Sequence, residues 1–374
     1  MTIHILHITY DMNIGGTEQV IRNLVEGLDK TRFKSSIACI DGVIGPWGQE
    51  LETKGFKHFC FKRQPGFDFQ VIKALRKLLK TEKIDIVHCH QYTPYTYGWF
   101  ASLFTGIPVI FTEHGRFYPD FSSSKRRFIN PILQMRTALI TAISQATKDA
   151  LVKYEYLSAN RIEVIYNGIA DLSGKRNPEQ DQALKQSLGF TESDIIFGTI
   201  SRLDPIKNQS MMIKAFAEAL KTQPHIKLLI VGDGPLREDL ETLTRSLGIE
   251  TNVTFTGFQP NPQSYLSIMD VFLLPSLSEG TSMTLLEAMS FSKPTIATAV
   301  GGTPEILKHK DTGMLTNNNN QEELEQAIGL LAAKEALRKS LGDMARQDYI
   351  QHFTVKAMTD NYQTSYSALT HKTD

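Results

Sequence analysis

Short apolar runs rich in β-branched residues alternate with helical patterns along most of this chain, and this alternation limits the folds it can adopt. In the N-terminal half, the runs that predict strands are Ile3–Ile8, Ser36–Ile40, His58–Phe61, Ile84–Cys89, Val109–Thr112, Ala138–Ile143 and Ile162–Ile165. In the C-terminal half they are Ile195–Ile200, Lys227–Val231, Val253–Phe255, Val271–Leu274 and Thr295–Ala299. Helical patterns such as Glu18–Leu28 and Gln209–Leu220 lie between them. This order predicts parallel sheets covered by helices on both faces.

The alternation is interrupted once, by the polar, turn-forming run Asp171–Asp181. We therefore expect an α/β protein with two doubly wound, Rossmann-like domains at residues 1–170 and 195–350, joined by a linker at 171–194. A final helix at about Val355–Ala368 has no strand after it, so we expect residues 351–374 to pack back on the N-terminal domain. Ligands of such sheets bind beyond the carboxyl ends of the strands, which predicts a cleft lined by both sets of strand ends.

Composition and charge narrow the class of protein. The 374 residues carry no formal net charge, which argues against a dedicated nucleic-acid-binding protein. Residues 1–172 hold 21 Lys and Arg against 16 Asp and Glu, which leaves 19 and 24 for the rest of the chain. A mildly basic N-terminal half suits an anionic acceptor or a membrane surface, and chance explains it equally well.

Cysteine usage and hydropathy indicate the compartment. The cysteines Cys39, Cys60 and Cys89 are scattered and odd in number, which favours reduced thiols in the cytoplasm. The segment Met1–Tyr10 lacks a basic start and a small-residue cleavage site, so we interpret it as a strand. The most apolar window, Tyr97–Phe111, is too short and too interrupted to span a membrane.

The segment Ser276–Met289 carries the most informative chemistry. Glu279 and Glu287 stand eight residues apart, between a buried strand and a helical pattern, so Glu279 lies at a strand end and Glu287 about one turn into the helix. The backbone amides of roughly Thr281 to Leu285 are expected to be unpaired donors at the positive end of the helix dipole. A phosphate seat flanked by two carboxylates that hold sugar hydroxyls suits a nucleotide-sugar.

Two further strand ends carry candidate site residues. Arg202 and Lys207 follow the first strand of the second unit, where a guanidinium and an ammonium suit a diphosphate leaving group. A solvated basic loop is the alternative. His114 follows a strand of the first unit and is placed to face a reacting sugar, although a histidine simply packed at a strand end fits the same pattern.

Glycine-rich turns mark other strand ends. Gly15 and Gly16 lie between the first strand and a helix, where they allow a ligand close to the backbone or simply form a turn. They do not match the dinucleotide fingerprint. The turns at 231–235 and 300–305 are similar, and in the second of these Thr303 is expected to be the N-cap. Tyr166 to Gly168 is expected to form a tight turn.

Two other features are open to a functional and a plain interpretation. His88 and His90 point to one face of a strand and Cys89 to the other, and no third ligand is evident, so we predict no metal site. There is also no Asp-x-Asp pair to hold a cation. The loop 117–128 combines aromatic residues with the basic triplet Lys125 to Arg127, which suits lipid headgroups or a solvated loop.

Taken together, these motifs resemble those of the retaining glycosyltransferases of the GT-B fold, family GT4. The segment from Ser278 to Met289 is similar to the family's E-x7-E motif, and Arg202 and Lys207 match its diphosphate-binding pair. Gly15–Glu18, Glu113–Gly115 and Tyr166–Ile169 resemble its glycine loop, its histidine segment and its pre-linker turn. The resemblance covers nearly the whole chain. Thr281 and Ser282 depart from the family's usual pair after the first Glu-Gly, which leaves the donor open.

The resemblance implies a site and a reaction. The implied catalytic residues are His114, Arg202, Lys207 and Glu279; the implied donor-binding residues are Gly15, Gly16, Thr281, Ser282, Met283, Thr284 and Glu287. Within this set the two cations stabilise the departing diphosphate, and Glu287 binds the ribose. No metal or other cofactor is implied, and a UDP-sugar is the favoured donor.

The resemblance therefore implies an enzyme that moves a sugar to an acceptor hydroxyl, in bacterial surface polysaccharide or lipid-linked glycan assembly. The N-terminal domain would hold the glycan or lipid-linked acceptor, and the C-terminal domain the nucleotide-sugar. The expected location is the cytoplasm, with peripheral contact at the inner membrane. A nucleotide-sugar 2-epimerase of the same fold and a non-catalytic nucleotide-sugar-binding protein are the alternatives.

Overall fold

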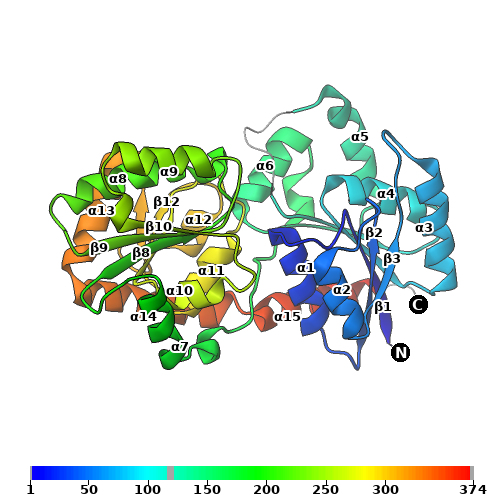
Figure 1. Ribbon diagram of the computed structural model, residues 1–374. Helices are drawn as coiled ribbons and strands as arrows, with labels where there is room; N and C mark the ends of the chain where they lie inside the picture. The colour runs from blue at the N-terminus through cyan, green and yellow to red at the C-terminus, as the bar shows by residue number, and fades with distance from the viewer. Residues whose placement is uncertain (1, 116–121, 371–374) are drawn as a thin grey trace. The chain divides into compact units, whose positions relative to one another are not determined.

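The computed structural model describes residues 2–115 and 122–370, and these form two compact units. The first unit comprises the chain up to Ile169 together with the segment that begins at Thr354, and the second runs from Ala170 to Phe353. Figure 1 colours the chain along its length, so that the red C-terminal helix is seen to belong with the blue and cyan elements. The segment 171–194, expected as a linker, carries a helix of the second unit.

The sheet of the first unit has seven strands in the order β3-β2-β1-β4-β5-β6-β7, and every pairing within it is parallel. The strands are β1 (Ile3–Thr9), β2 (Phe33–Cys39), β3 (Lys57–Cys60), β4 (Ile86–His90), β5 (Val109–Glu113), β6 (Leu139–Ala142) and β7 (Ile162–Val164). The seven strand runs expected from this part of the sequence all appear. The register places His7 of β1 opposite His88 of β4, so that the two side chains share one face.

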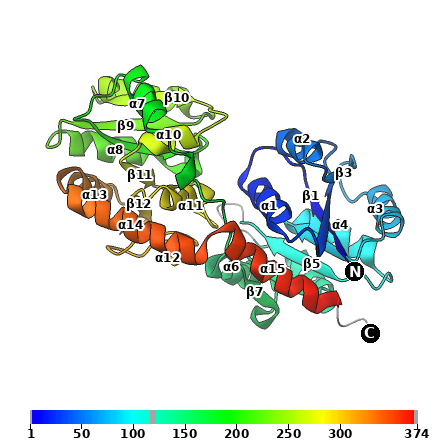
Figure 2. The same cartoon turned by 90° about the horizontal axis from the view of Figure 1, so that it is seen from below.

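Helices cover both faces of this sheet. They are α1 (Gly16–Gly27), α2 (Gly45–Thr53), α3 (Phe69–Thr81), α4 (Tyr92–Ser102), α5 (Ser124–Met135), α6 (Gln145–Glu155) and α15 (Val355–Thr370), with the short 3-10 turn η1 (Ala159–Arg161). Figure 2 shows α1 and α2 on one side of β1 and α3 on the other. This division follows from right-handed crossovers, because the chain moves outward through α1 and α2 and then turns back through α3.

The apolar pattern of each strand explains which face it buries. Ala38 of β2 belongs to the core under α3 to α6, whereas Ile37 and Cys39 of the same strand pack under α1 and α2. Opposite faces of a strand therefore enter different cores, as alternation requires.

The last helix is tied to the first unit at its start. The amide of Val355 donates to the carbonyl of Ile169 at 2.8 Å. A Cβ at Gly168 would lie 2.2 Å from the carbonyl oxygen of Thr354, so the turn that ends at Gly168 needs glycine for close backbone approach. Helix α15 then packs against α1, where Val355 lies over Gly27.

The second unit has a six-stranded parallel sheet in the order β10-β9-β8-β11-β12-β13. The strands are β8 (Ile195–Ile200), β9 (Ile226–Val231), β10 (Val253–Gly257), β11 (Val271–Leu274), β12 (Thr295–Thr298) and β13 (Met314–Thr316). The helices are α7 (Pro178–Ser187), α8 (Gln209–Leu220), α9 (Arg237–Ser246), α10 (Gln263–Ile268), α11 (Met283–Ser290), α12 (Thr303–Ile306), α13 (Gln321–Ala333) and α14 (Glu335–His352), with the 3-10 turns η2 (Ser173–Lys175), η3 (Pro205–Lys207) and η4 (Glu250–Asn252).

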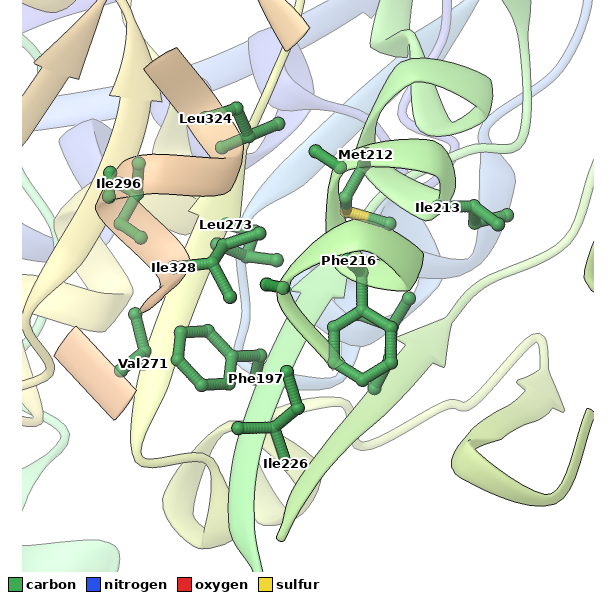
Figure 3. Close-up of a cluster of buried hydrophobic side chains, with 14 of the residues drawn as sticks. Phe197, Met212, Ile213, Phe216, Ile226, Val271, Leu273, Ile296, Leu324 and Ile328 are labelled. Carbon is green, nitrogen blue, oxygen red and sulfur yellow. The ribbon is translucent and has the colours of Figure 1, made fainter. Parts of the chain in front are cut away.

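Its main core lies between this sheet and helices α8, α9 and α13. Figure 3 shows Phe197 and Leu273 of the strands meeting Phe216 of α8 and Ile328 of α13, and all four side chains are fully buried. Burial of such side chains contributes about 2 kcal/mol each relative to exposure, so this layer holds the strand ends of the second unit in place. Within the described ranges, none of the helices is both long and apolar enough to cross a bilayer.

Candidate active site

The segment with two glutamates is a loop followed by a buried helix. Strand β11 ends at Leu274, the loop carries Glu279, and Glu287 is the fifth residue of α11, as the pattern predicted. Ser282 is the N-cap, and its Oγ accepts a hydrogen bond from the amide of Leu285 at 3.3 Å. The prediction that the amides up to Leu285 are all unpaired is therefore wrong at Leu285, because the serine side chain occupies it.

Glu279 is held by a cation and a hydroxyl. Its Oε1 accepts from Nζ of Lys207 at 2.6 Å and from Oγ of Ser276 at 2.6 Å. The Glu279 side chain is 9% exposed and the Lys207 side chain 25%, so water screens this ion pair less than one on the open surface. An ammonium has three donors, so Lys207 keeps others to offer an anion.

Backbone contacts set the distance between these two side chains. The amide of Leu277 donates to the carbonyl of Ile206 at 2.8 Å, which joins the loop after β11 to η3. Gln209 fixes the loop that carries Arg202, since its Nε2 donates to the carbonyl of Arg202 at 2.9 Å. The Lys207–Glu279 pair is thus held by two loops that are fixed to neighbouring structure.

Arg202 is placed differently from Lys207. Its side chain is 73% exposed and pairs with Asp204, with Nε and Oδ2 3.0 Å apart. The guanidinium lies in water, so it can turn toward another anion, whereas Asp204 is only 14% exposed and would lose its cation. The structure brings Lys207 to Glu279, and it leaves Arg202 at the surface of the same loop.

Glu287 is a buried carboxylate with only 4% of the residue exposed. Its Oε1 accepts from Nε2 of Gln263 in α10 at 3.2 Å. Of the neighbouring residues predicted to bind the donor, Thr281, Ser282 and Met283 are also buried, and Thr284 is partly exposed. Gln263 was not found from the sequence, because it lies 24 residues before Glu287 in a short helix without a distinctive pattern.

The glycine turns of the second unit shape this edge through their backbone. A Cβ at Gly301 would lie 1.8 Å from the carbonyl oxygen of Glu279, and φ there is +51°. A Cβ at Gly234 would lie 2.4 Å from the carbonyl oxygen of Leu203. Both turns therefore pack directly on the loops that carry Glu279 and Arg202. Thr303 is not the N-cap that the sequence predicted: Gly302 is, and the Thr303 hydroxyl makes no hydrogen bond.

In the first unit, His114 ends a chain of three imidazoles. Its Nε2 lies 2.8 Å from Nδ1 of His90, and Nε2 of His90 lies 3.1 Å from Nδ1 of His7. Burial lowers the pKa of His7 and of His114 to about 3, and lowers the pKa of His90 well below its ordinary value. All three rings are therefore neutral at physiological pH.

The sequence pointed to His114 and His90 separately, and it missed His7. The three residues lie on β4, on β1 and just after β5, which are adjacent in the sheet, and strand order is what a sequence does not give. The only available signal was the placement of three histidines at or near the carboxyl ends of predicted strands.

His7, His88 and His90 also form the cluster that could hold a metal ion, with ligand nitrogens within 4.8 Å of one another. Five of their six ring nitrogens already have partners, however, and Nε2 of His7 is the one without. His88 contacts the Tyr366 hydroxyl at 2.7 Å and Oγ1 of Thr112 at 2.6 Å, and His7 uses Nδ1 for His90. An ion would have to break these bonds, so the donor set fits a hydrogen-bonded network better than a metal centre.

Gly15 and Gly16 begin α1, where Gly15 is the N-cap with an extended backbone. A Cβ at Gly15 would lie 2.4 Å from Oε2 of Glu18, so the carboxyl group folds back over this glycine. Burial raises the pKa of Glu18 to about 7. The absence of a side chain at Gly15 thus makes room for Glu18.

In the basic segment Lys125 to Arg127, Arg126 makes structural contacts, whereas other residues of helix α5 lie at the surface. Residues 117–121 of the loop predicted at 117–128 lie outside the described residues. Arg126 forms an ion pair with the buried Glu155 and lies over the ring of Tyr92. On α5, Phe128, Ile132 and Met135 are 72%, 61% and 77% exposed.

The chain matches two protein-family models that together cover most of its length. The family described as glycosyl transferases group 1 matches residues 180–348, and glycosyltransferase family 4 matches residues 14–171. These ranges fall in the second and the first unit, with the first range starting inside α7.

Individual relatives agree with these matches. N-acetyl-alpha-D-glucosaminyl L-malate synthase of Bacillus anthracis is 31% identical over 81% of this chain and 79% of its own length. UDP-Gal:alpha-D-GlcNAc-diphosphoundecaprenol alpha-1,3-galactosyltransferase of Escherichia coli is 26% identical over 97% of this chain and 96% of its own. The crystal structure of Anabaena HepE in complex with UDP superposes with a TM-score of 0.85 at 24% identity, covering 98% of this chain and 100% of that one.

The sequence similarity and the two Rossmann-like units lead to one assignment. The chain is a glycosyltransferase of the GT-B fold that belongs to family 4, the group 1 glycosyltransferases.

Proposed function

We propose that this enzyme transfers a sugar, with retention of configuration, from a nucleotide-diphosphate donor to a hydroxyl of a glycan or lipid-linked acceptor. A UDP-sugar is the favoured donor, and the reaction needs no metal or other cofactor and no nucleic acid. The observation that carries the proposal is the Lys207–Glu279 pair at the carboxyl edge of the second sheet, with Glu287 buried in the helix that follows.

The Lys207–Glu279 pair supports a role for the cations of the site in stabilising the leaving phosphate. Cleavage of the bond between sugar and diphosphate builds negative charge on the leaving phosphate. Lys207 is held in place by Glu279, so its ammonium is already oriented when that charge develops, and such preorganisation lowers the barrier. Arg202, whose side chain is 73% exposed, would turn from Asp204 to the phosphate and add a second cation.

The carboxylates would then bind hydroxyl groups of the donor. Glu287 is buried beside Gln263, and a carboxylate suits two adjacent ribose hydroxyls. Glu279 would accept from hydroxyls of the sugar, and His114 would contact the sugar or stabilise the oxocarbenium-like transition state. The residues Thr281, Ser282, Met283 and Thr284 would lie along the phosphates, and Gly15 and Gly16 would also bind the donor.

The names of the relatives support the donor and acceptor classes. The Escherichia coli relative is named for a UDP-galactose donor and a diphosphoundecaprenol-linked acceptor, and HepE was solved with UDP and with UDP-glucose. The Bacillus anthracis relative is named for malate, a small acceptor. These names favour a UDP-sugar, and we propose a lipid-linked or surface glycan as the acceptor in this chain.

Calorimetry with a panel of nucleotides tests the donor site. UDP, GDP, ADP and their common sugar conjugates are titrated, with and without EDTA, into the wild type, Glu287→Gln and the control Glu241→Gln. Glu241 is a surface carboxylate paired with Arg237 in α9. We expect one nucleotide to bind regardless of EDTA, and to lose at least tenfold in affinity only in Glu287→Gln. Equal affinities in both variants, or no binding in the whole panel, would contradict the site assignment.

Product analysis tests the reaction. With the donor identified, NMR of the glycoside formed on a polyprenyl-diphosphate-sugar acceptor should show the same anomeric configuration as the donor. An inverted product would disprove retention. Conversion of the donor to an epimer without acceptor would favour the epimerase instead.

We also propose that the enzyme works at the cytoplasmic membrane face through α5. Phe128, Ile132 and Met135 recur at helical spacing and are exposed, and Lys125 and Arg127 stand at the start of the same helix. An apolar stripe flanked by cations suits the boundary of an anionic bilayer, where a lipid-linked acceptor is found.

Vesicle binding tests this surface. Co-sedimentation with phosphatidylglycerol vesicles should exceed that with phosphatidylcholine vesicles, and the double substitution of Phe128 and Ile132 by serine should abolish it. The matched control is Phe258→Ser, at a residue that is 59% exposed in the second unit. Binding that survives the double substitution would rule out α5 as the contact.

A further inference from the structure

The imidazole chain in the first unit has two unpaired ends. Besides the two hydrogen bonds that join His7, His90 and His114, Nε2 of His7 and Nδ1 of His114 are buried and have no hydrogen-bond partner. His7 and His90 are fully buried, and His114 is partly exposed at the end of β5. An unpaired buried donor is costly, so the position of each proton in this chain matters.

Proton counting leaves only two neutral arrangements. Three neutral rings carry three protons, and two of them must lie in the two hydrogen bonds, because a shared nitrogen pair needs one donor and one acceptor. His90 has a single proton, so both bonds must run in the same direction. The third proton is therefore on Nδ1 of His114, or on Nε2 of His7 when both bonds are reversed.

The surroundings distinguish the two arrangements. In the first, the unpaired N–H belongs to His114. Its Nδ1 is covered in the free protein, but the residue is partly exposed at the sheet edge, so a small shift of the ring opens this N–H to a ligand oxygen or water. In the second, the unpaired N–H belongs to His7, which is 0% exposed in the middle of the sheet. The desolvation penalty cannot be relieved there, so the first arrangement is the more stable.

We propose that His7 and His90 are positioning residues that hold His114 as the tautomer protonated at Nδ1. The N–H of His114 then donates a hydrogen bond to a hydroxyl or phosphate oxygen of a substrate at the carboxyl edge of the first sheet. This last step rests on the proposed function, whereas the tautomer is a property of the free protein.

NMR of the free enzyme tests the tautomer directly. Two-bond ¹⁵N–¹H correlation spectra of histidine-labelled protein distinguish protonated from unprotonated ring nitrogens. We expect a protonated Nδ1 and an accepting Nε2 for His114 at pH 7.5, assigned by its loss in His114→Gln. A protonated Nε2, or a doubly protonated ring, would overturn the proposal.

Two variants of His90 separate positioning from packing. In His90→Asn the amide nitrogen takes the place of Nδ1 and still donates to Nε2 of His114. In His90→Gln the amide takes the place of Nε2, so the bond to His7 survives and the bond to His114 is lost. We expect His90→Gln to mix the tautomers of His114 and to lower kcat/KM about tenfold, which one neutral hydrogen bond accounts for.

We expect His90→Asn to keep the wild-type tautomer and to stay within about twofold of wild-type kcat/KM. The control is His88→Asn, which lies at 4.2 Å ring distance from His90 and has no hydrogen bond to His114. It should leave the His114 spectrum unchanged. Equal kcat/KM in the two His90 variants would overturn the positioning role.

The two proposals fail in different ways. If the tautomer is as expected but the wild type transfers no sugar, the proposed function is wrong and the positioning role of His7 and His90 stands. If transfer occurs but Nε2 of His114 carries the proton, the positioning role is wrong and the proposed function stands.

Discussion

Lowering the pH from 7.5 to 5 should destabilise the first unit through its buried histidines. Burial lowers the pKa of His7 to about 3, and lowers the pKa of His88 and of His90 well below 6.5. The unfolded imidazoles titrate near 6.5, so their stabilising effect is complete above that pH and is lost as the pH falls toward the folded pKa. At pH 5, which is about 1.5 pH units below the pKa of the unfolded imidazole, protonation of the unfolded state costs about 2 kcal/mol of stability at His7, and burial of His88, His90 and His114 adds to this loss.

Other groups in the unit titrate in the same range. Burial raises the pKa of Glu18 to about 7, so this carboxyl contributes stability as the pH falls and offsets about 2 kcal/mol. Burial lowers the pKa of His4 and of His58, which adds to the loss. The pH-dependent change in the unfolding free energy of the wild type therefore includes several groups. Comparison with a variant that lacks one histidine isolates the contribution of that ring.

Urea denaturation followed by tryptophan fluorescence measures this difference. The chain has two tryptophans, Trp47 and Trp99, and both lie in the first unit, so fluorescence reports on that unit alone. Between pH 7.5 and 5, the wild type should lose about 2 kcal/mol more of its unfolding free energy than His7→Gln. The control Lys30→Gln, at an exposed position, should match the wild type. Equal pH dependence in the wild type and His7→Gln would refute the reasoning.

Three further substitutions test individual contacts. Lys207→Met should lower kcat about 100-fold while donor affinity in calorimetry changes only a few-fold, because the cation acts mainly on charge that develops during the reaction; a loss confined to affinity would contradict this role. Gly301→Ala should lower the free energy of unfolding by at least about 2 kcal/mol in urea denaturation followed by circular dichroism, because its Cβ meets the backbone of Glu279. Gly329→Ala in α13 has open space around it, so it should raise the free energy of unfolding by up to about 1 kcal/mol. Glu18→Gln should raise the stability of the first unit by about 2 kcal/mol at pH 7.5 and by much less at pH 5, since it removes a buried charge; an equal gain at both pH values would show that the carboxyl is already neutral.

Much of the architecture was predictable from the periodicity of apolar residues and the spacing of turn residues. The twelve predicted strand runs needed only β-branched or aromatic residues and flanking turns, and both units followed from their alternation with helices. Helix α4 was not predicted, because Tyr95, Tyr97 and Trp99 are buried around most of its circumference. A helix buried on all sides has no polar face, so the periodic pattern that marks a surface helix is missing.

The site was predictable as a set of residues and not as a set of contacts. The sequence named Lys207 and Glu279, which lie 72 residues apart, but their 2.6 Å contact depends on how the loop after β11 meets η3. His7 escaped notice for the same reason, since only the order of strands places it beside His90. Gly301 looked like a turn former, yet its role is to let one backbone approach another.

The hydrogen bond between Val355 and Ile169 has a consequence for the evolution and engineering of this chain. It holds the residue that precedes the second unit beside the segment that follows it, so residues 170–353 are an insertion whose two ends meet at one point of the first unit. A segment with adjacent ends can be exchanged without altering its host, because no strand or helix of the host spans the junction. The second unit of a relative could therefore be grafted between Ile169 and Thr354 while both cores stay intact.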